Sequence, residues 1–288
     1  MKASEFHSSR KFAETQFGRI AYVERGRGPV ALFVHGLPLC GYQWRSALDE
    51  LAALRTCIAP DLMGLGYTEV RAGQDLSFEA QAQALAAFLE SRAIAQVDLV
   101  GNDTGGGVSQ IFAARYPNKV RTLTLTNCEV SDLWPNAMLK QFYAALQAGL
   151  VAETFKVMAR DPRTAQAQLV SVYEHPEALN SELLEVYFGP FADSADRREL
   201  VKGFAAAERN RDQIVAVASQ LRTSRIPSQV LWGDADTAFD GPASLGWLRD
   251  NLGGLRRVTT VPHAKLFWPE EHPRLLTVLL KEFWASAN

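Results

Sequence analysis

Between an apolar run at residues 97–100 and a helical pattern that starts at residue 108 lies the glycine-rich segment Gly101–Gly107. This order predicts a strand, a sharp turn and a helix, with Asp103 at the apex and a glycine two residues before and two after it. Such a turn is the pattern of a nucleophile elbow, which presents a reactive side chain above the carboxyl end of a strand. Glycines are needed because the neighbouring backbone comes so close that a Cβ atom would clash. An elbow usually presents serine, whereas this one presents Asp103.

Three other interpretations compete for the same segment. A dinucleotide-binding turn places its second glycine where Asp103 stands, and a carboxylate there would repel the pyrophosphate. A phosphate-binding loop ends in Gly-Lys-Ser or Gly-Lys-Thr, which this segment lacks. An acid that caps the helix starting at Thr104 has a real mechanism, because the free N–H groups of a helix start accept an anion. The segment alone leaves capping and catalysis open, so the rest of the chain must decide.

Composition bounds the class of protein. The 288 residues, of which 47% are hydrophobic, can bury a large core. Thirty basic residues stand against thirty-two acidic ones, so we expect neither a nucleic acid nor a membrane surface as partner. The polar residues 1–11 do not form a secretion signal, and the three cysteines are scattered without a pair suited to zinc or redox exchange. We therefore expect a cytoplasmic protein with reduced thiols.

Strand-like and helical patterns alternate along residues 1–130, beginning with a hairpin within residues 12–24. From 131 to 222 only helical patterns follow one another, and the alternation returns in residues 223–288. We predict an α/β fold with a mostly parallel, doubly wound sheet formed by 1–130 and 223–288, and a helical cap at 131–222 inserted after the sixth strand. Because ligands bind at the carboxyl ends of such strands, the cap is expected to lie above Asp103.

Three motifs occur together in this order: the turn His35-Gly36-Leu37-Pro38 followed by Trp44-Arg45, the loop Asp61–Gly64, and the elbow with Asp103. With them the chain resembles the α/β-hydrolase fold along nearly its whole length, and most closely its epoxide hydrolase and haloalkane dehalogenase branch. The resemblance implies that Asp103 is a nucleophile, which attacks a saturated carbon to form an ester that water later cleaves. It also implies a small-molecule substrate, no cofactor, no metal, and a monomer or homodimer.

The resemblance assigns further positions around the elbow. The backbone N–H groups of Leu37 and Thr104 would stabilise negative charge on the ester-forming carboxylate. His35 is expected to shape its turn rather than to react, and Trp44 is placed with it among the substrate-binding positions.

The remaining catalytic positions follow the last strands. The segment Trp232–Asp236 matches the pattern that carries the family's acid, which makes Asp236 the candidate, with Glu129 as an alternative position. The family's histidine falls on Leu266, counted either from the strand end at Val261 or from the stretch that ends at Pro273. His263 lies three residues earlier. Either His263 reaches the site from a shifted loop, or Glu270 or a cap residue serves as the base that activates water.

These features favour hydrolysis of a small apolar electrophile, and an epoxide rather than an alkyl halide. Dehalogenases carry tryptophan and asparagine where this chain has Thr104 and Leu37. Epoxide hydrolases activate the ring oxygen with cap tyrosines, for which the chain offers Tyr143, Tyr173 and Tyr187. Two alternatives stay open: an isomerase, lyase or cyclase that uses Asp103 as acid or base with a raised pKa, and a catalytically idle ligand-binding member of the fold.

Overall fold

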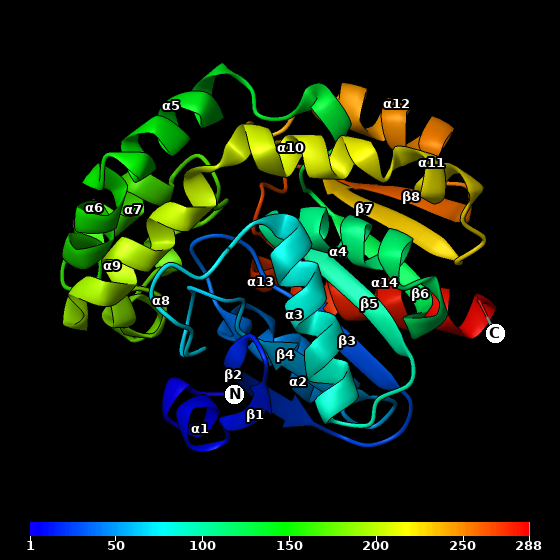
Figure 1. Ribbon diagram of the computed structural model, residues 1–288, viewed down its shortest axis with the longest axis horizontal. Coiled ribbons are helices and arrows are strands. Elements are labelled where there is room, and N and C mark those ends of the chain that lie inside the picture. Colours follow the sequence, from blue (N-terminus) through cyan, green and yellow to red (C-terminus); the bar gives the residue numbers. More distant parts are fainter. Residues whose placement is uncertain (288) are drawn as a thin grey trace.

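An eight-stranded sheet forms the centre of the molecule, as a computed structural model that describes residues 1–287 shows (Figure 1). Its strands are β1 (Lys11–Thr15), β2 (Gly18–Arg25), β3 (Val30–Val34), β4 (Thr56–Pro60), β5 (Val97–Asn102), β6 (Val120–Thr126), β7 (Ser228–Gly233) and β8 (Leu255–Val261). They lie in the order β1-β2-β4-β3-β5-β6-β7-β8. β1 pairs antiparallel with β2, and β2 antiparallel with β4, whereas all other neighbours are parallel. The predicted hairpin and the α/β-hydrolase fold with its mostly parallel sheet are confirmed.

Helices cover both faces of the sheet because its central strands are apolar on both sides. Every residue of β5 is buried, and so are Ala31 to Val34 of β3. Helices α3 and α4 pack side by side on one face, and α2 contacts α14 on the other (Figure 1). The helices of the core are α1 (Ala3–Ser8), α2 (Arg45–Leu51), α3 (Phe78–Ser91), α4 (Thr104–Arg115), α12 (Gly241–Asn251), α13 (Trp268–Glu271) and α14 (Pro273–Ser286).

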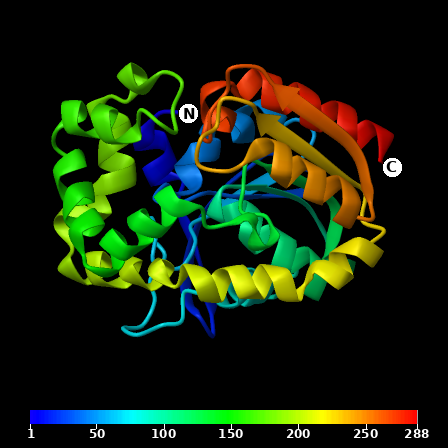
Figure 2. The same ribbon diagram turned by 90° about the horizontal axis from the view of Figure 1, so that it is seen from above.

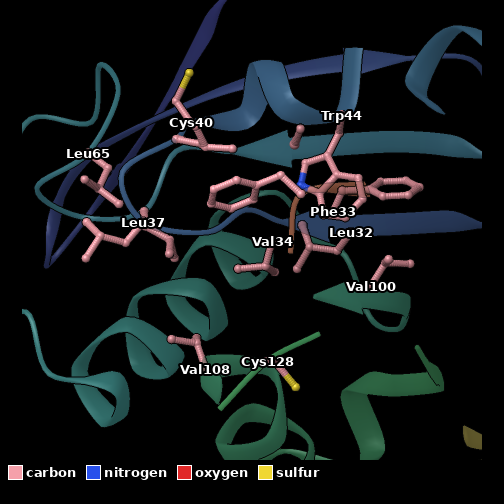
Figure 3. Close-up of a cluster of buried hydrophobic side chains, with 14 of the residues drawn as sticks. Leu32, Phe33, Val34, Leu37, Cys40, Trp44, Leu65, Val100, Val108 and Cys128 are labelled. Carbon is pink, nitrogen blue, oxygen red and sulfur yellow. The ribbon is translucent and has the colours of Figure 1, made fainter. Parts of the chain in front are cut away.

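The hydrophobic core continues up to the carboxyl ends of the central strands. Figure 3 shows side chains of β3 and β5 together with Trp44 and Leu37 from the segment after β3, and with Val108 from α4. Trp44 is 1% exposed and its ring lies 5.5 Å from that of Phe33, measured between centroids. This packing fixes the ends of β3 and β5, where the elbow is placed.

The chain between β6 and β7 is helical throughout. It contains α5 (Ala137–Gln147), α6 (Leu150–Met158), α7 (Pro162–Leu169), α8 (Ser181–Asp193), α9 (Ala195–Val201), α10 (Ala207–Ala216) and α11 (Ala218–Thr223). Helices α5 to α9 form a separate body beside the strand ends, which we call the cap (Figure 2). The last two helices return to the core, where α10 packs against α3 and α4, and α11 against α4 and α12. In the part of the chain that the structure describes, no helix combines the length and the apolar character that a membrane crossing requires.

Candidate active site

Asp103 stands at the turn between β5 and α4, with the backbone angles φ 53° and ψ −133°. A positive φ is unusual for a residue with a side chain, and such strain concentrates at functional sites. The turn is fastened on both sides: the Asp103 N–H donates to the carbonyl of Asn127 at 2.8 Å, and the Asp103 carbonyl accepts from the N–H of Gly106 at 2.7 Å. A Cβ atom on Gly105 would collide with the carbonyl oxygens of Val34 and His35, so the sharp turn depends on that glycine.

The Asp103 carboxylate is held from the opposite loop. The Leu37 N–H donates to its Oδ2 atom at 2.7 Å. The approach requires Gly36, because a Cβ atom there would lie 2.5 Å from Oδ2. Among the described residues, no side chain donates a hydrogen bond to this carboxylate. One carboxylate oxygen is thus oriented by the backbone N–H of Leu37.

His35 shapes this loop from inside the protein. Its Nε2 accepts from the Leu62 N–H at 2.9 Å, and its Nδ1 lies 3.0 Å from the Gly36 carbonyl. These contacts suit a neutral ring with the proton on Nδ1, and burial lowers the pKa of His35. The predicted structural role of His35 agrees with this arrangement, because both ring nitrogens are engaged by backbone groups.

Burial governs the protonation of Asp103. Loss of hydration raises its pKa to about 7, the backbone N–H groups of Thr104 and Leu37 act in the opposite direction, and the nearby Asp236 carboxylate adds to the increase. A group with a pKa near neutrality can both give and accept a proton. The Asp103 carboxyl group can therefore act as an acid or a base near neutral pH.

A cavity of about 230 Å³ opens above Asp103. Its floor is formed by Leu37, Asp103 and Thr104, and its walls by apolar side chains of α5, α6 and α7 together with Leu266 and Phe267. The lining contains no histidine, lysine or arginine; its titratable side chains are Asp103 and Tyr143. Such a site suits a small, mainly apolar and uncharged molecule.

Leu266 and His263, the two positions considered for the family's histidine, differ in burial and in whether they line the cavity. Leu266 is 4% exposed and lines the cavity, and its carbonyl accepts from Asn102 Nδ2 at 3.0 Å. His263 is exposed and absent from the cavity lining, in a turn with φ 63° whose N–H donates to Asp234. The structure does not bring His263 to Asp103, so the expectation of a base reaching in from a shifted loop needs correction. The turn after β8 directs the imidazole to solvent.

Asp236 lies near Asp103, in the loop after β7, without a histidine between them. Its Oδ2 accepts from Asn127 Nδ2 at 2.9 Å and its Oδ1 from the Ala238 N–H at 2.8 Å. Burial raises its pKa to about 6. Asn127 was missed by the sequence analysis, although it directly follows β6. Its side chain also bonds to Gly233 and Trp268. Asn127 thus joins the elbow, through its backbone carbonyl, to the acid loop and α13, through its side-chain amide.

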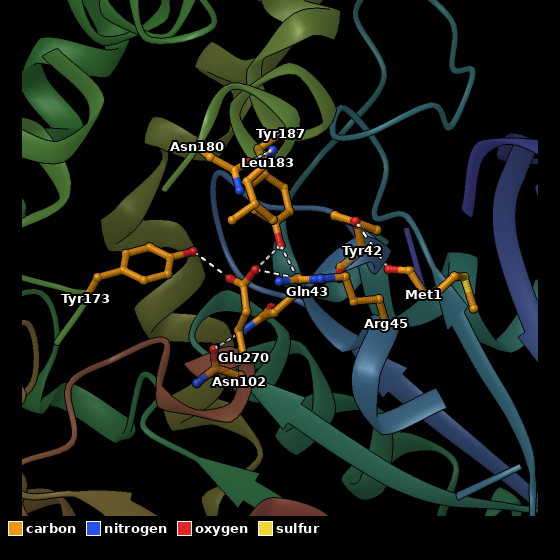
Figure 4. Close-up of polar contacts among 10 residues, drawn as sticks. All are labelled: Met1, Tyr42, Gln43, Arg45, Asn102, Tyr173, Asn180, Leu183, Tyr187 and Glu270. Atoms are coloured by element: carbon orange, nitrogen blue, oxygen red, sulfur yellow. Dashed lines mark hydrogen bonds and ion pairs between the residues drawn. The ribbon is translucent and has the colours of Figure 1, made fainter. Parts of the chain in front are cut away.

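The proposed base Glu270 is occupied by other contacts, as Figure 4 shows. Arg45 Nη1 lies 2.5 Å from Glu270 Oε1, Tyr187 donates to the same oxygen at 2.7 Å, and Tyr173 donates to Oε2 at 2.7 Å. We call these four residues the clasp, because two come from the core and two from the cap segment. Glu270 is therefore not available as a base, and of the three tyrosines considered only Tyr143 lines the cavity.

Trp44 also differs from its expected place. It is buried against Phe33 and does not line the cavity, so the structure corrects its placement among the substrate-binding positions. Its ring packs in the hydrophobic core against Phe33. No group of three or more His, Cys, Asp or Glu side chains within residues 1–287 has an arrangement that could bind a metal ion.

Comparisons with known proteins match the whole architecture. A model of the alpha/beta hydrolase fold family matches residues 29–264. The chain is 28% identical over 255 residues to a haloalkane dehalogenase of Mesorhizobium japonicum, covering 84% of this chain and 79% of that protein. It is 24% identical over 266 residues to a cis-3-alkyl-4-alkyloxetan-2-one decarboxylase of Shewanella oneidensis, covering 89% of this chain and 80% of that protein. The solved structure of the epoxide hydrolase CorEH superposes with a TM-score of 0.81 at 21% identity, covering 97% of this chain and 99% of CorEH.

Proposed function

Because the chain belongs to the alpha/beta hydrolase fold family, we propose that it is an enzyme in which Asp103 attacks a small apolar electrophile, an epoxide in the first place. The observation that carries this proposal is the anchoring of one carboxylate oxygen by the Leu37 N–H at 2.7 Å at the floor of an apolar cavity. Backbone donors there can stabilise the oxyanion that forms when the ester is cleaved.

The cavity lining favours an epoxide over a haloalkane. By the resemblance, dehalogenases hold the departing halide with a tryptophan and an asparagine, and the lining contains neither residue. An epoxide oxygen stays attached to the product and needs one proton. Tyr143 lines the cavity, and burial raises the pKa of its hydroxyl well above its usual value, so that it stays protonated. Because haloalkane dehalogenases are among the relatives, the test below includes haloalkanes as well as epoxides.

Intact-mass measurement after incubation with a set of 1,2-epoxides and 1-haloalkanes tests the proposal. We expect either diol release or an increase in mass by one epoxide, located on the peptide that contains Asp103. Asp103→Asn should abolish both, and Asp250→Asn, an exposed acid of α12, should change neither. No adduct and no turnover with any member of the set would overturn the proposal.

A second candidate function is proton transfer by Asp103 in an isomerase, lyase or cyclase. Two observations favour it: the Asp103 pKa of about 7 and the absence of a histidine from the cavity lining. In addition, one relative is named as a decarboxylase and not as a hydrolase. A carboxyl titration of Asp103 near 4 in an NMR experiment would count against this candidate, as would covalent attachment of the substrate to Asp103.

A further inference from the structure

A second buried carboxyl group next to the elbow is that of Glu129, which the sequence analysis names as the alternative position for the family's acid. Glu129 follows β6 by three residues and is 0% exposed. Its Oε1 lies 3.2 Å from Thr104 Oγ1, and its backbone carbonyl accepts from Gln110 Nε2 at 2.7 Å. Its Oε2 is buried without a hydrogen-bond partner among the described residues.

The charged and titratable groups around Glu129 are acidic or neutral. Asp103 faces it from the elbow, Tyr143 from α5, and Cys128 precedes it in the chain. No lysine, arginine or histidine within residues 1–287 forms an ion pair with it. An ionised carboxylate in such surroundings is strongly disfavoured, so Glu129 holds a proton. In agreement, burial and then the Asp103 carboxylate raise the pKa of Glu129 well above its usual value.

Thr104 connects this proton to the cavity. Its hydroxyl contacts Glu129, and Thr104 itself lines the floor of the cavity beside Asp103. A hydroxyl both donates and accepts, so it can pass a proton from a carboxylic acid on one side to an oxygen on the other. Thr104 therefore connects the buried carboxylic acid of Glu129 to the cavity above Asp103.

We propose that Glu129 is a positioning residue that stores a proton and exchanges it with the substrate through the Thr104 hydroxyl, in place of the family's histidine. This role rests on the proposed function. It gives the site a second titrating group that reaches the cavity through Thr104, whereas the family's pattern would put the base at Leu266.

Glu129 loses its proton in the first half of the reaction and regains one in the second half. When Asp103 attacks an epoxide carbon, the carbon–oxygen bond of the ring breaks and its electron pair goes to the oxygen. Thr104 gives that oxygen a proton and receives the one from Glu129, which leaves a Glu129 carboxylate. In the second half, water passes a proton through Thr104 to Glu129 and its oxygen attacks the ester carbonyl. The ester bond breaks, the leaving oxygen takes the remaining proton of the attacking water to complete a diol, and Asp103 and Glu129 return to their starting states.

Infrared difference spectroscopy on the resting enzyme tests the stored proton without any substrate. We expect a carboxylic acid C=O band at neutral pH that Glu129→Gln removes. In Asp103→Asn that band should titrate at lower pH, because the neighbouring carboxylate that raises the Glu129 pKa is gone. If Glu129→Gln removes no such band, the proposal is wrong whatever the turnover is, and this readout stays separate from the adduct test on Asp103.

A second experiment measures kcat and KM of matched threonine variants, with an epoxide that the intact-mass experiment shows to react. Thr104→Val and Glu129→Gln should lower kcat about 10²-fold or more with little change in KM, the usual effect of losing a proton-transfer group. Thr104→Ser should restore most of the rate. Thr277→Val removes the same kind of hydroxyl from a remote pair, Thr277 Oγ1 to Glu50 Oε2 at 2.7 Å, and should leave kcat unchanged. A Thr104→Val enzyme with wild-type kcat would overturn the relay.

Discussion

Leu266 and Asp103 line the same cavity, so an apolar side chain stands at the position where the sequence analysis expects a histidine base. Asp236 lies near Asp103 with its own carboxylate oxygens already engaged by Asn127 and Ala238. Asp236 thus lies close enough to influence the elbow acid, and no histidine, lysine or arginine lines the cavity above it. This arrangement makes the second half of an ester-hydrolysis reaction the step most open to change by mutation.

Leu266→His should accelerate hydrolysis of an ester on Asp103, because an imidazole at this position adds a general base, commonly worth about 10²–10⁴-fold. The decay of the covalent adduct, followed by intact mass after a pulse of epoxide, measures the effect. Leu266→Asn is the matched control, since it is polar but cannot act as a base at neutral pH. Equal decay in both variants would contradict the role given to this position.

Tyr143→Phe should slow the opening of epoxides and leave the reaction with 1-haloalkanes unaffected, because only the epoxide oxygen would accept a hydrogen bond from the Tyr143 hydroxyl, while the Thr104 hydroxyl delivers the proton. We expect a fall of about 10-fold in the rate of adduct formation, since a hydrogen bond to a charged oxygen contributes about 1.5–3 kcal/mol. Tyr173→Phe serves as the comparison, since that hydroxyl bonds to Glu270 outside the cavity. A similar fall for both electrophile classes would point to altered packing instead.

Asp103→Asn should stabilise the protein at pH 8 and have little effect at pH 4. The folded-state pKa of about 7 lies above the ordinary value of 3.8, so protonation favours the folded state and this contribution is lost as the pH rises from about 4 to about 7. At about 1.4 kcal/mol for each pKa unit, the variant should gain a few kcal/mol in the free energy of unfolding above pH 7. Urea unfolding of both proteins across this range checks the sign. A wild type that matches the variant at pH 8 would contradict it.

Glu270→Gln should lower stability by about 3–5 kcal/mol, because it leaves the Arg45 guanidinium buried without its charge partner. Denaturant unfolding measures the change. Asp193→Asn provides the comparison, since its ion pair with Arg160 is exposed on both sides and such pairs contribute about 0–1 kcal/mol. Equal losses in the two variants would mean that the clasp is no stronger than a surface pair.

His263→Asn should leave adduct formation and turnover unchanged, because the imidazole is exposed and outside the cavity lining. Asparagine is chosen because it tolerates the positive φ of 63° better than alanine. Steady-state rates and melting temperature are measured together, so that a folding defect is recognised. Loss of turnover in a stably folded variant would return His263 to the site.

The elbow could be predicted because its cause is local. Glycines on either side of Asp103 and an apolar run before it specify the strand, the turn and the helix, and β1 and β2 follow from alternation around Gly18. The side-chain directions of the later segments depend on long-range contacts. Glu270 meets Arg45 across 225 positions of sequence, and nothing near either residue indicates the pair. Tyr143, Tyr173 and Tyr187 look alike in the sequence, and only the packing of their helices decides which one lines the cavity.

The clasp also limits how this protein could be re-engineered. Arg45 and Glu270 belong to the core, whereas the hydroxyls that complete their contacts arrive from Tyr173 and Tyr187. A cap grafted from another member of the family without those two tyrosines would leave the buried Glu270 Oε2 without its donor and Oε1 with Arg45 alone. Chimeras that transplant the cap should therefore be designed with all four residues as one unit.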